Sequence, residues 1–76
     1  MLLTITSLNK VLFHGEADSI TVPGVSGEMT ILKDHMPIVS AVKEGSIIVK
    51  SKGNEEVIDI NGGVLEVYKN VVTILS

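Results

Sequence analysis

Hydrophobic and polar residues alternate with a period of two along most of the chain. Leu3 and Ile5 alternate with threonines, and Ile20 and Val22 alternate with Ser19 and a threonine. Successive side chains of a β-strand point to opposite faces of a sheet, so this period predicts strands with one buried face. No window keeps the apolar spacing of three and four residues over the length that a helix needs. The pattern therefore predicts an all-β chain without a substantial helix.

Turn residues divide this pattern into short strands. Turns are expected at residues 24–27, 43–45, 52–54, 61–63 and 69–70, where Gly and Asn are frequent. Gly and Asn tolerate the left-handed backbone conformation that tight turns require. The strongest turn signal is Asn-Gly-Gly at 61–63, between expected strands over 56–60 and 64–68. This spacing predicts about ten strands in one domain over residues 1–76, arranged as a flattened β-sandwich or barrel.

The core must be built almost entirely from aliphatic residues. Hydrophobic residues make up 45% of the chain, but the only aromatic ones are Phe13 and Tyr68. Val, Ile and Leu suit a pleated surface, and Phe13 is expected to join them in the core. Glu66, between Leu65 and Val67, is expected on the opposite, solvent-facing side of its strand. The surplus of aliphatic residues is either absorbed by two packed sheets or partly exposed at an interface.

The charges and the apolar runs exclude several kinds of partner. The net charge is −3, the six basic residues are scattered lysines, and arginine is absent. Arginine supplies most bidentate contacts to phosphate and guanine, so nucleic-acid binding is not expected. No apolar run approaches the roughly 18 residues of a membrane span. The first ten residues alternate in polarity, unlike a signal peptide. We therefore expect no direct membrane insertion.

The sequence offers no constellation for catalysis, metal binding or cofactor binding. The two histidines, His14 and His35, are far apart, and cysteine is absent, so no zinc-ligand spacing exists. Ser26 lies in Gly-Val-Ser-Gly, which lacks the Gly-x-Ser-x-Gly pattern of a nucleophile elbow. The same glycine-rich segment is not followed by the Lys-Ser or Lys-Thr of a phosphate-binding loop. We predict no catalytic residue, no metal and no cofactor.

Several motifs follow one another in a recognisable order. They are Val-Leu-Phe-His-Gly at 11–15, Gly-Glu-Met-Thr-Ile-Leu at 27–32, His-Met-Pro-Ile-Val-Ser-Ala-Val-Lys-Glu-Gly at 35–45, and Gly-Gly-Val-Leu-Glu-Val at 62–67. Each is weak alone, but together they extend over the whole chain in register. With them the chain resembles the N-terminal β-sandwich domain of the epsilon subunit of bacterial F-type ATP synthases.

The resemblance implies a ten-stranded β-sandwich at the foot of the enzyme's central stalk. In that family the domain binds the gamma subunit and the c-ring as a non-catalytic rotor component of a hetero-oligomer. It couples proton translocation to ATP synthesis, while catalysis takes place in the alpha and beta subunits. The resemblance also implies a peripheral position at the cytoplasmic face of the bacterial inner membrane.

The resemblance assigns partner contacts to individual positions. The c-ring side falls on Ser26, Gly27, Glu28 and Met29, with Pro37 and Ile38 close by; the gamma side falls on Ser7, His35 and Ser40. A carboxylate at the rim of an interface, such as that of Glu28, favours register and association rate. The alternatives are a solvated turn acid at Glu28 and a turn histidine that binds local backbone at His35.

Two departures from the family pattern and one alternative remain. Residues 43–45 read Lys-Glu-Gly where the family often has Lys-Pro-Gly. The sequence ends at Ser76, without the two-helix hairpin that carries inhibition and, in some bacteria, ATP binding, so neither role is assigned. The alternative is another small β-sandwich binding module, above all a lipoyl- or biotinyl-type carrier domain, which presents a modified lysine at a hairpin tip. Lys52 lies at such a tip, but its neighbours Ser51 and Gly53 argue against this alternative.

Overall fold

The computed structural model describes all residues from 1 to 76 and contains only strands. In chain order they are β1 (Leu2–Ser7), β2 (Lys10–Glu16), β3 (Ser19–Gly24), β4 (Gly27–Leu32), β5 (Ile38–Ser51), β6 (Asn54–Tyr68) and β7 (Val71–Leu75). The prediction of an all-β fold is therefore confirmed. The expected number of about ten strands is wrong, since the structure has a 7-stranded sheet.

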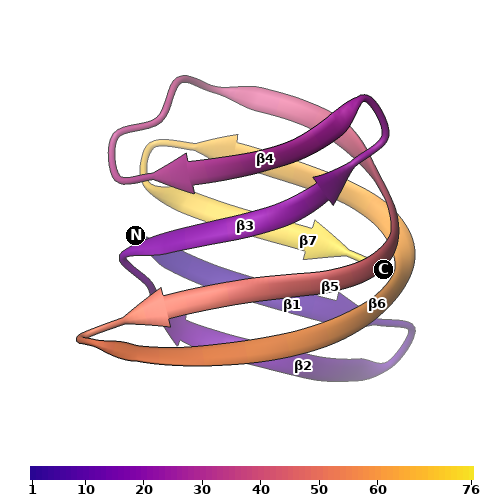
Figure 1. The fold of residues 1–76 in the computed structure, drawn as a ribbon, viewed down its shortest axis with the longest axis horizontal. Coiled ribbons are helices and arrows are strands. Elements are labelled where there is room, and N and C mark those ends of the chain that lie inside the picture. The colour runs from indigo at the N-terminus through magenta and orange to yellow at the C-terminus, as the bar shows by residue number, and fades with distance from the viewer.

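The count differs because two of the expected turns lie inside long strands. Val42 pairs with Gly63 and Glu44 pairs with Asn61, so the segments 43–45 and 61–63 face each other across the ladder between β5 and β6. Both strands bend at this point, as Figure 1 shows on the right of the view. The turn predicted at 61–63 is thus a bend in a strand. The turn predicted at 52–54 is the true end of this hairpin, where Ser51 pairs with Asn54.

The bend folds one sheet into two facing layers. The strand order is β2-β1-β7-β6-β5-β3-β4, with β1 and β7 parallel. What we call the β3 layer contains β3, β4 and the segments 46–51 and 54–60. The β1 layer contains β1, β2, β7 and the segments 38–42 and 64–68. The sheet does not close into a barrel, because β2 and β4 remain its edges.

The core lies between the two layers and is aliphatic, as the composition predicts. The buried apolar residues are Met1, Leu3, Ile5, Ala17, Ile20, Val22, Ile31, Val42, Ile47, Val49, Ile60, Leu65, Val67, Val72 and Ile74. The predicted alternation is confirmed in β1, where Leu3 and Ile5 are fully buried. Glu66 is exposed between two buried neighbours, also as predicted. Phe13 is half-buried and packs against the core.

Candidate partner-binding surfaces

The outward side of the β1 layer is largely apolar. We call this surface the apolar face and define it by the outward-facing residues Leu2, Val11, Val39, Ala41, Val64, Tyr68, Val71 and Leu75, all of which are exposed. They come from five strands that are neighbours in the sheet. Large apolar patches are uncommon on the surface of soluble monomers and mark interaction sites.

The strand register places these residues in two rows, except Val39, which pairs with Glu66 between them. Val64 pairs with Leu75, Leu75 pairs with Thr6, and Thr6 pairs with Val11, which forms one row across the layer. In the other row, Tyr68 pairs with Val71. Neighbouring strands lie about 5 Å apart, so the apolar side chains within each row are close enough to form a continuous surface.

A polar stripe runs between the two apolar rows. Glu66 pairs with Thr73, Thr73 with Thr4, and Thr4 with His14. The Thr4 hydroxyl oxygen lies 2.9 Å from His14 Nδ1. A partner that covers the apolar rows therefore meets hydrogen-bonding groups at fixed positions between them, which favours one docking orientation.

The outward side of the β3 layer is mainly polar. The hydroxyl groups of Thr21 and Thr30 lie 3.2 Å apart, and Ser46 donates a hydrogen bond of 2.6 Å to Asp59. Lys50 and Glu55 form an ion pair on the same side. The exposed apolar side chains here, such as Val57, lie among these polar groups. The two outward sides of the sandwich thus differ in chemistry.

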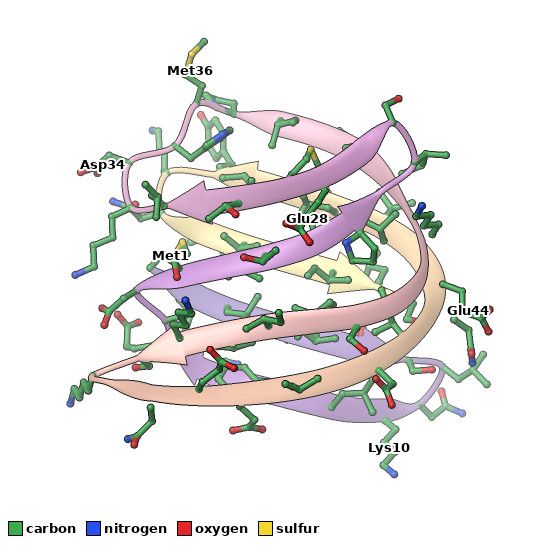
Figure 2. All side chains as sticks on the ribbon, in the orientation of Figure 1. Met1, Lys10, Glu28, Asp34, Met36 and Glu44 are labelled. Atoms are coloured by element: carbon green, nitrogen blue, oxygen red, sulfur yellow. The ribbon has the colours of Figure 1, made fainter.

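The residues predicted to face the c-ring lie near the two ends of β4. Ser26 lies in the exposed β3–β4 turn, and Gly27 is the exposed first residue of β4. Glu28 is also exposed, on the outward side of the β3 layer, and forms no ion pair (Figure 2). At the other end, Pro37 is exposed just before β5.

Two residues of the predicted c-ring set point toward the interior instead. Met29 and Ile38 are half-buried and pack against the hydrophobic core. Sequence reasoning grouped them with the exposed positions because it used motif position and not strand phase. Met29 stands in the same phase as the buried Ile31, so its alternation carried the signal.

The residues predicted to face gamma are not brought together. His35 lies in the β4–β5 loop, and its Nδ1 lies 2.8 Å from the carbonyl oxygen of Met36, in accord with a histidine that binds local backbone. Ser40 lies in β5 and donates a weak hydrogen bond of 3.3 Å to the carbonyl of Ala41. Ser7 ends β1, at the opposite side of the view in Figure 1 from the β4–β5 loop.

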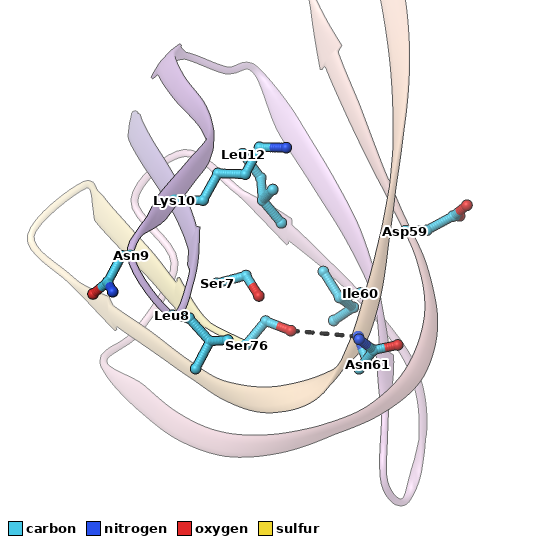
Figure 3. Close-up of a pocket in the computed structure, with 9 residues that line it drawn as sticks. All are labelled: Ser7, Leu8, Asn9, Lys10, Leu12, Asp59, Ile60, Asn61 and Ser76. Carbon is cyan, nitrogen blue, oxygen red and sulfur yellow. Dashed lines mark hydrogen bonds between the residues drawn. The ribbon is translucent and has the colours of Figure 1, made fainter.

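Ser7 borders an open groove between β2 and β6. The groove has a volume of about 520 Å³ and is lined by Ser7, Leu8, Asn9, Lys10, Leu12, Asp59, Ile60, Asn61 and Ser76 (Figure 3). The hydroxyl of Ser76 accepts a hydrogen bond of 3.3 Å from the backbone N–H of Asn61. The lining carries no nucleophile with an adjacent base, so its geometry does not suggest catalysis.

Asp18 is the titratable group with a clearly shifted pKa, and it acts in the scaffold. Its carboxylate accepts a hydrogen bond of 2.9 Å from the backbone N–H of Lys52, which is the largest cause that lowers the pKa of Asp18. The nearby ammonium group of Lys33, 3.6 Å away, lowers it further. This contact joins the start of β3 to the β5–β6 hairpin.

Nowhere do three or more histidine, aspartate or glutamate side chains converge in a way that would bind a metal ion. No helix is long and apolar enough to cross a membrane.

The sequence of the whole chain matches a known family. All of residues 1–76 match the sequence model described as ATP synthase, Delta/Epsilon chain, beta-sandwich domain. The chain belongs to this family. The resemblance inferred from the motifs is thereby confirmed, and the Delta/Epsilon assignment favours the stalk interpretation over the carrier-domain alternative.

Curated relatives carry the same family name. The ATP synthase epsilon chain of Bordetella petrii is 41% identical over 73 residues, which cover 95% of this chain and 52% of the relative. The ATP synthase epsilon chain of Delftia acidovorans is 40% identical, with 95% and 53% covered. The chain therefore spans about half the length of these Delta/Epsilon relatives.

Solved structures agree with the family assignment. A chain in the Euglena gracilis mitochondrial ATP synthase structure of OSCP, F1 and c-ring superimposes with a TM-score of 0.91 at 28% identity, covering 97% of this chain and 48% of that one. A chain in the central stalk and c-ring structure of the Tetrahymena thermophila mitochondrial ATP synthase gives a TM-score of 0.81 at 15% identity, with 97% and 60% covered. The second likeness shows the fold alone.

Proposed function

We propose that this chain acts as the β-sandwich of an ATP synthase epsilon subunit, a non-catalytic rotor component that binds gamma and the c-ring. In this role it couples proton translocation to ATP synthesis, while the alpha and beta subunits perform catalysis. It works at the cytoplasmic face of the bacterial inner membrane, held there through its partners. Family membership and the names of the relatives support this proposal.

The difference between the two outer faces gives the proposal its main support. A domain that works alone gains nothing from exposing Val39, Tyr68 and Val71 on one side while the other side is mainly polar. A domain that is permanently docked buries that side, and the burial contributes about 25 cal/mol per Å² of apolar area removed from water. We assign the apolar face to gamma, the large partner of the stalk.

The predicted gamma-facing residues do not have side chains on this face. Ser40 lies in β5 in the inward phase of the buried Val42, so only its backbone adjoins the apolar face. Ser7 is the last residue of β1 and lines the groove between β2 and β6, so its side chain does not belong to that face. His35 precedes β5 in the chain, and its contact with gamma depends on how far the partner extends beyond this strand.

The c-ring is assigned to a different surface. Ser26, Gly27 and Glu28 are exposed around the β3–β4 turn, where a polar rim suits the polar loops of a membrane rotor. Pro37 lies beyond the other end of β4, apart from this rim, and Met29 and Ile38 pack against the core. Because the rim and the apolar face are separate, one chain can bind both partners at once.

The direct test is binding to the gamma subunit of the same host. Purified chain and gamma are mixed and the Kd is measured by isothermal titration calorimetry. We expect a complex with a Kd in the micromolar range or tighter, about −8 kcal/mol or more favourable. Absence of binding at micromolar concentrations would reject the stalk assignment. Intact mass of the chain from its native host tests the carrier alternative, because a lipoyl or biotinyl group would add mass to Lys52.

A further inference from the structure

Of the four asparagines in the chain, only Asn61 is followed by glycine. Asn9, Asn54 and Asn70 precede lysine, glutamate and valine. Asparagine deamidates most readily before glycine, because glycine has no side chain that hinders attack of its own backbone nitrogen on the asparagine amide. The dipeptide at 61–62 lies at the bend of β6, in the middle of the sheet.

The side chain of Asn61 is free to react. Asn61 is exposed beside the open groove, and only its backbone N–H is hydrogen-bonded, to the Ser76 hydroxyl at 3.3 Å (Figure 3). No hydrogen bond within the chain holds its side-chain amide. Asn70 differs, because its Oδ1 and Nδ2 are both bound to Asp34.

The backbone at Gly62 is released from regular strand pairing. Asn61 pairs with Glu44 and Gly63 pairs with Val42, while Gly62 has no partner in this ladder. Its φ is 101°, in a region that glycine enters at little cost. The nitrogen of Gly62 can therefore approach the side chain of Asn61 without loss of a ladder pair.

We propose that Asn61 is a site of non-enzymatic deamidation in the folded chain, with water as the only other reactant. The backbone nitrogen of Gly62 attacks Cγ of Asn61, its proton passes to the side-chain amide, and ammonia leaves. The product is a five-membered succinimide. Water then opens this ring at Cγ to give aspartate, or at the backbone carbonyl carbon to give isoaspartate. No oxidation or reduction takes place.

The position of Asn61 gives either product a structural effect. The new carboxylate lies directly opposite Glu44 in the ladder, and like charges at such positions destabilise a sheet. Isoaspartate also adds one backbone carbon to β6 just before Gly63, where a Cβ would already collide with the carbonyl oxygen of Leu75. Deamidation therefore weakens the bend that joins the two layers. This inference goes beyond the proposed function and does not depend on it.

The reaction is followed by mass spectrometry of the purified chain. Each deamidation replaces NH2 by OH and adds about 1 Da. Peptide mapping after timed incubation should show Asn61 reacting about tenfold or more faster than Asn9, Asn54 or Asn70. The rate should rise with pH, because the attacking nitrogen must lose its proton. Asn61→Gln, which would have to form a six-membered ring, should remove the fast reaction. Equal rates at all four asparagines would overturn the proposal.

Unfolded chain in urea shows whether the folded structure permits the reaction. We expect the rate at Asn61 in folded chain to lie within about tenfold of the rate in urea, because the bend leaves Gly62 unpaired. Fast reaction in urea with none in folded chain would show that the sheet protects Asn61, and the proposal would be wrong.

The structural effect is tested with a variant that contains the product. Asn61→Asp should lower Tm by about 4 °C at neutral pH. In a Glu44→Gln background the same substitution should lower Tm less, since the opposing charge is absent. Equal losses in both backgrounds would overturn the effect assigned to Glu44. All these measurements use the chain alone, so their outcome is independent of gamma binding.

Discussion

Asp34 and Asn70 bind each other through two hydrogen bonds although they lie far apart in the sequence. The backbone N–H of Asp34 donates to Asn70 Oδ1 at 2.7 Å, and Asn70 Nδ2 donates to the Asp34 carboxylate at 2.8 Å. Both residues have left-handed φ values, 61° and 62°. The carbonyl of Asn70 also accepts a hydrogen bond of 2.9 Å from the backbone N–H of Leu2. This contact joins the β4–β5 loop, the β6–β7 turn and the start of β1.

Two substitutions of Asn70 should distinguish what its side-chain hydrogen bonds contribute to the unfolding free energy from what its backbone conformation contributes. Asn70→Gly keeps the left-handed turn but loses the side-chain bonds, at about 1–2 kcal/mol of unfolding free energy. Asn70→Ala loses both and should cost about 1 kcal/mol more. Urea denaturation followed by circular dichroism measures both values. Equal losses for Gly and Ala would contradict a role for the backbone conformation.

The stability that Asp18 contributes should depend on pH. The pKa of Asp18 is lower in the folded chain than its ordinary value of 3.8, so the folded state favours the carboxylate. Its contribution is then fully present above that ordinary value and is lost as the pH falls through the lower, folded pKa. Asp18→Asn should reduce Tm at neutral pH, and the difference from wild type should shrink as the pH falls below about 4. A difference that does not change with pH would contradict this assignment.

Gly63 is required where β6 bends. Its φ is 144°, and a Cβ at this position would collide with the backbone carbonyl oxygen of Leu75. Gly63→Ala should therefore cost about 3 kcal/mol or more, from overpacking and backbone strain together. Gly53→Ala is the control, because Gly53 also has positive φ, 79°, but no atom within 4 Å of its Cβ position. Thermal denaturation of the two variants should show the larger loss for Gly63.

The alternation of the chain predicted the strands well but not their continuity. Leu3, Ile5, Ile20 and Val22 are buried as their period requires, because the side-chain period of a strand is a local property. Gly62 and Gly63 signal a left-handed backbone, and both have positive φ values, 101° and 144°. Whether such a segment reverses the chain or bends it depends on the strand opposite, here the segment 43–45, which local sequence does not reveal.

The apolar face was only half predictable. Val71-Val72 and Ile74-Leu75 are apolar at neighbouring positions, so both faces of β7 carry apolar residues, as in a strand that is covered on both sides. That signal indicates a covered outer face, but it does not tell which strands are neighbours. The pairing of β1 with β7, residues from opposite ends of the chain, collects the face into one surface.

A charge placed on the apolar face should disrupt gamma binding. Val71→Glu introduces a carboxylate that must be desolvated on docking, and the Kd should rise about tenfold or more. Val57→Glu is the matched control, since Val57 is 58% exposed against 47% for Val71 but lies on the outward side of the β3 layer. Titration calorimetry of both variants with gamma decides the question. Stronger weakening by Val57→Glu would place gamma on the opposite side of the sandwich.

Reversal of the charge at Glu28 should affect coupling and not assembly. Glu28 lies on the rim around the β3–β4 turn, apart from the apolar face, so Glu28→Lys should leave the Kd for gamma unchanged. If its carboxylate faces basic or amide groups on the c-ring, the reversal places like charges or unfavourable dipoles opposite each other. ATP-driven proton pumping, followed by quenching of a pH-sensitive dye in membrane vesicles, should then fall several-fold.

Glu56→Lys makes the same change of charge at an exposed position of β6, away from the rim, and should pump like the wild type. Because the two variants have the same net charge, a general electrostatic effect would lower pumping in both. A defect confined to Glu28→Lys, with gamma binding intact, would therefore assign that carboxylate to the c-ring. Unchanged pumping in Glu28→Lys would leave it as a solvated turn acid.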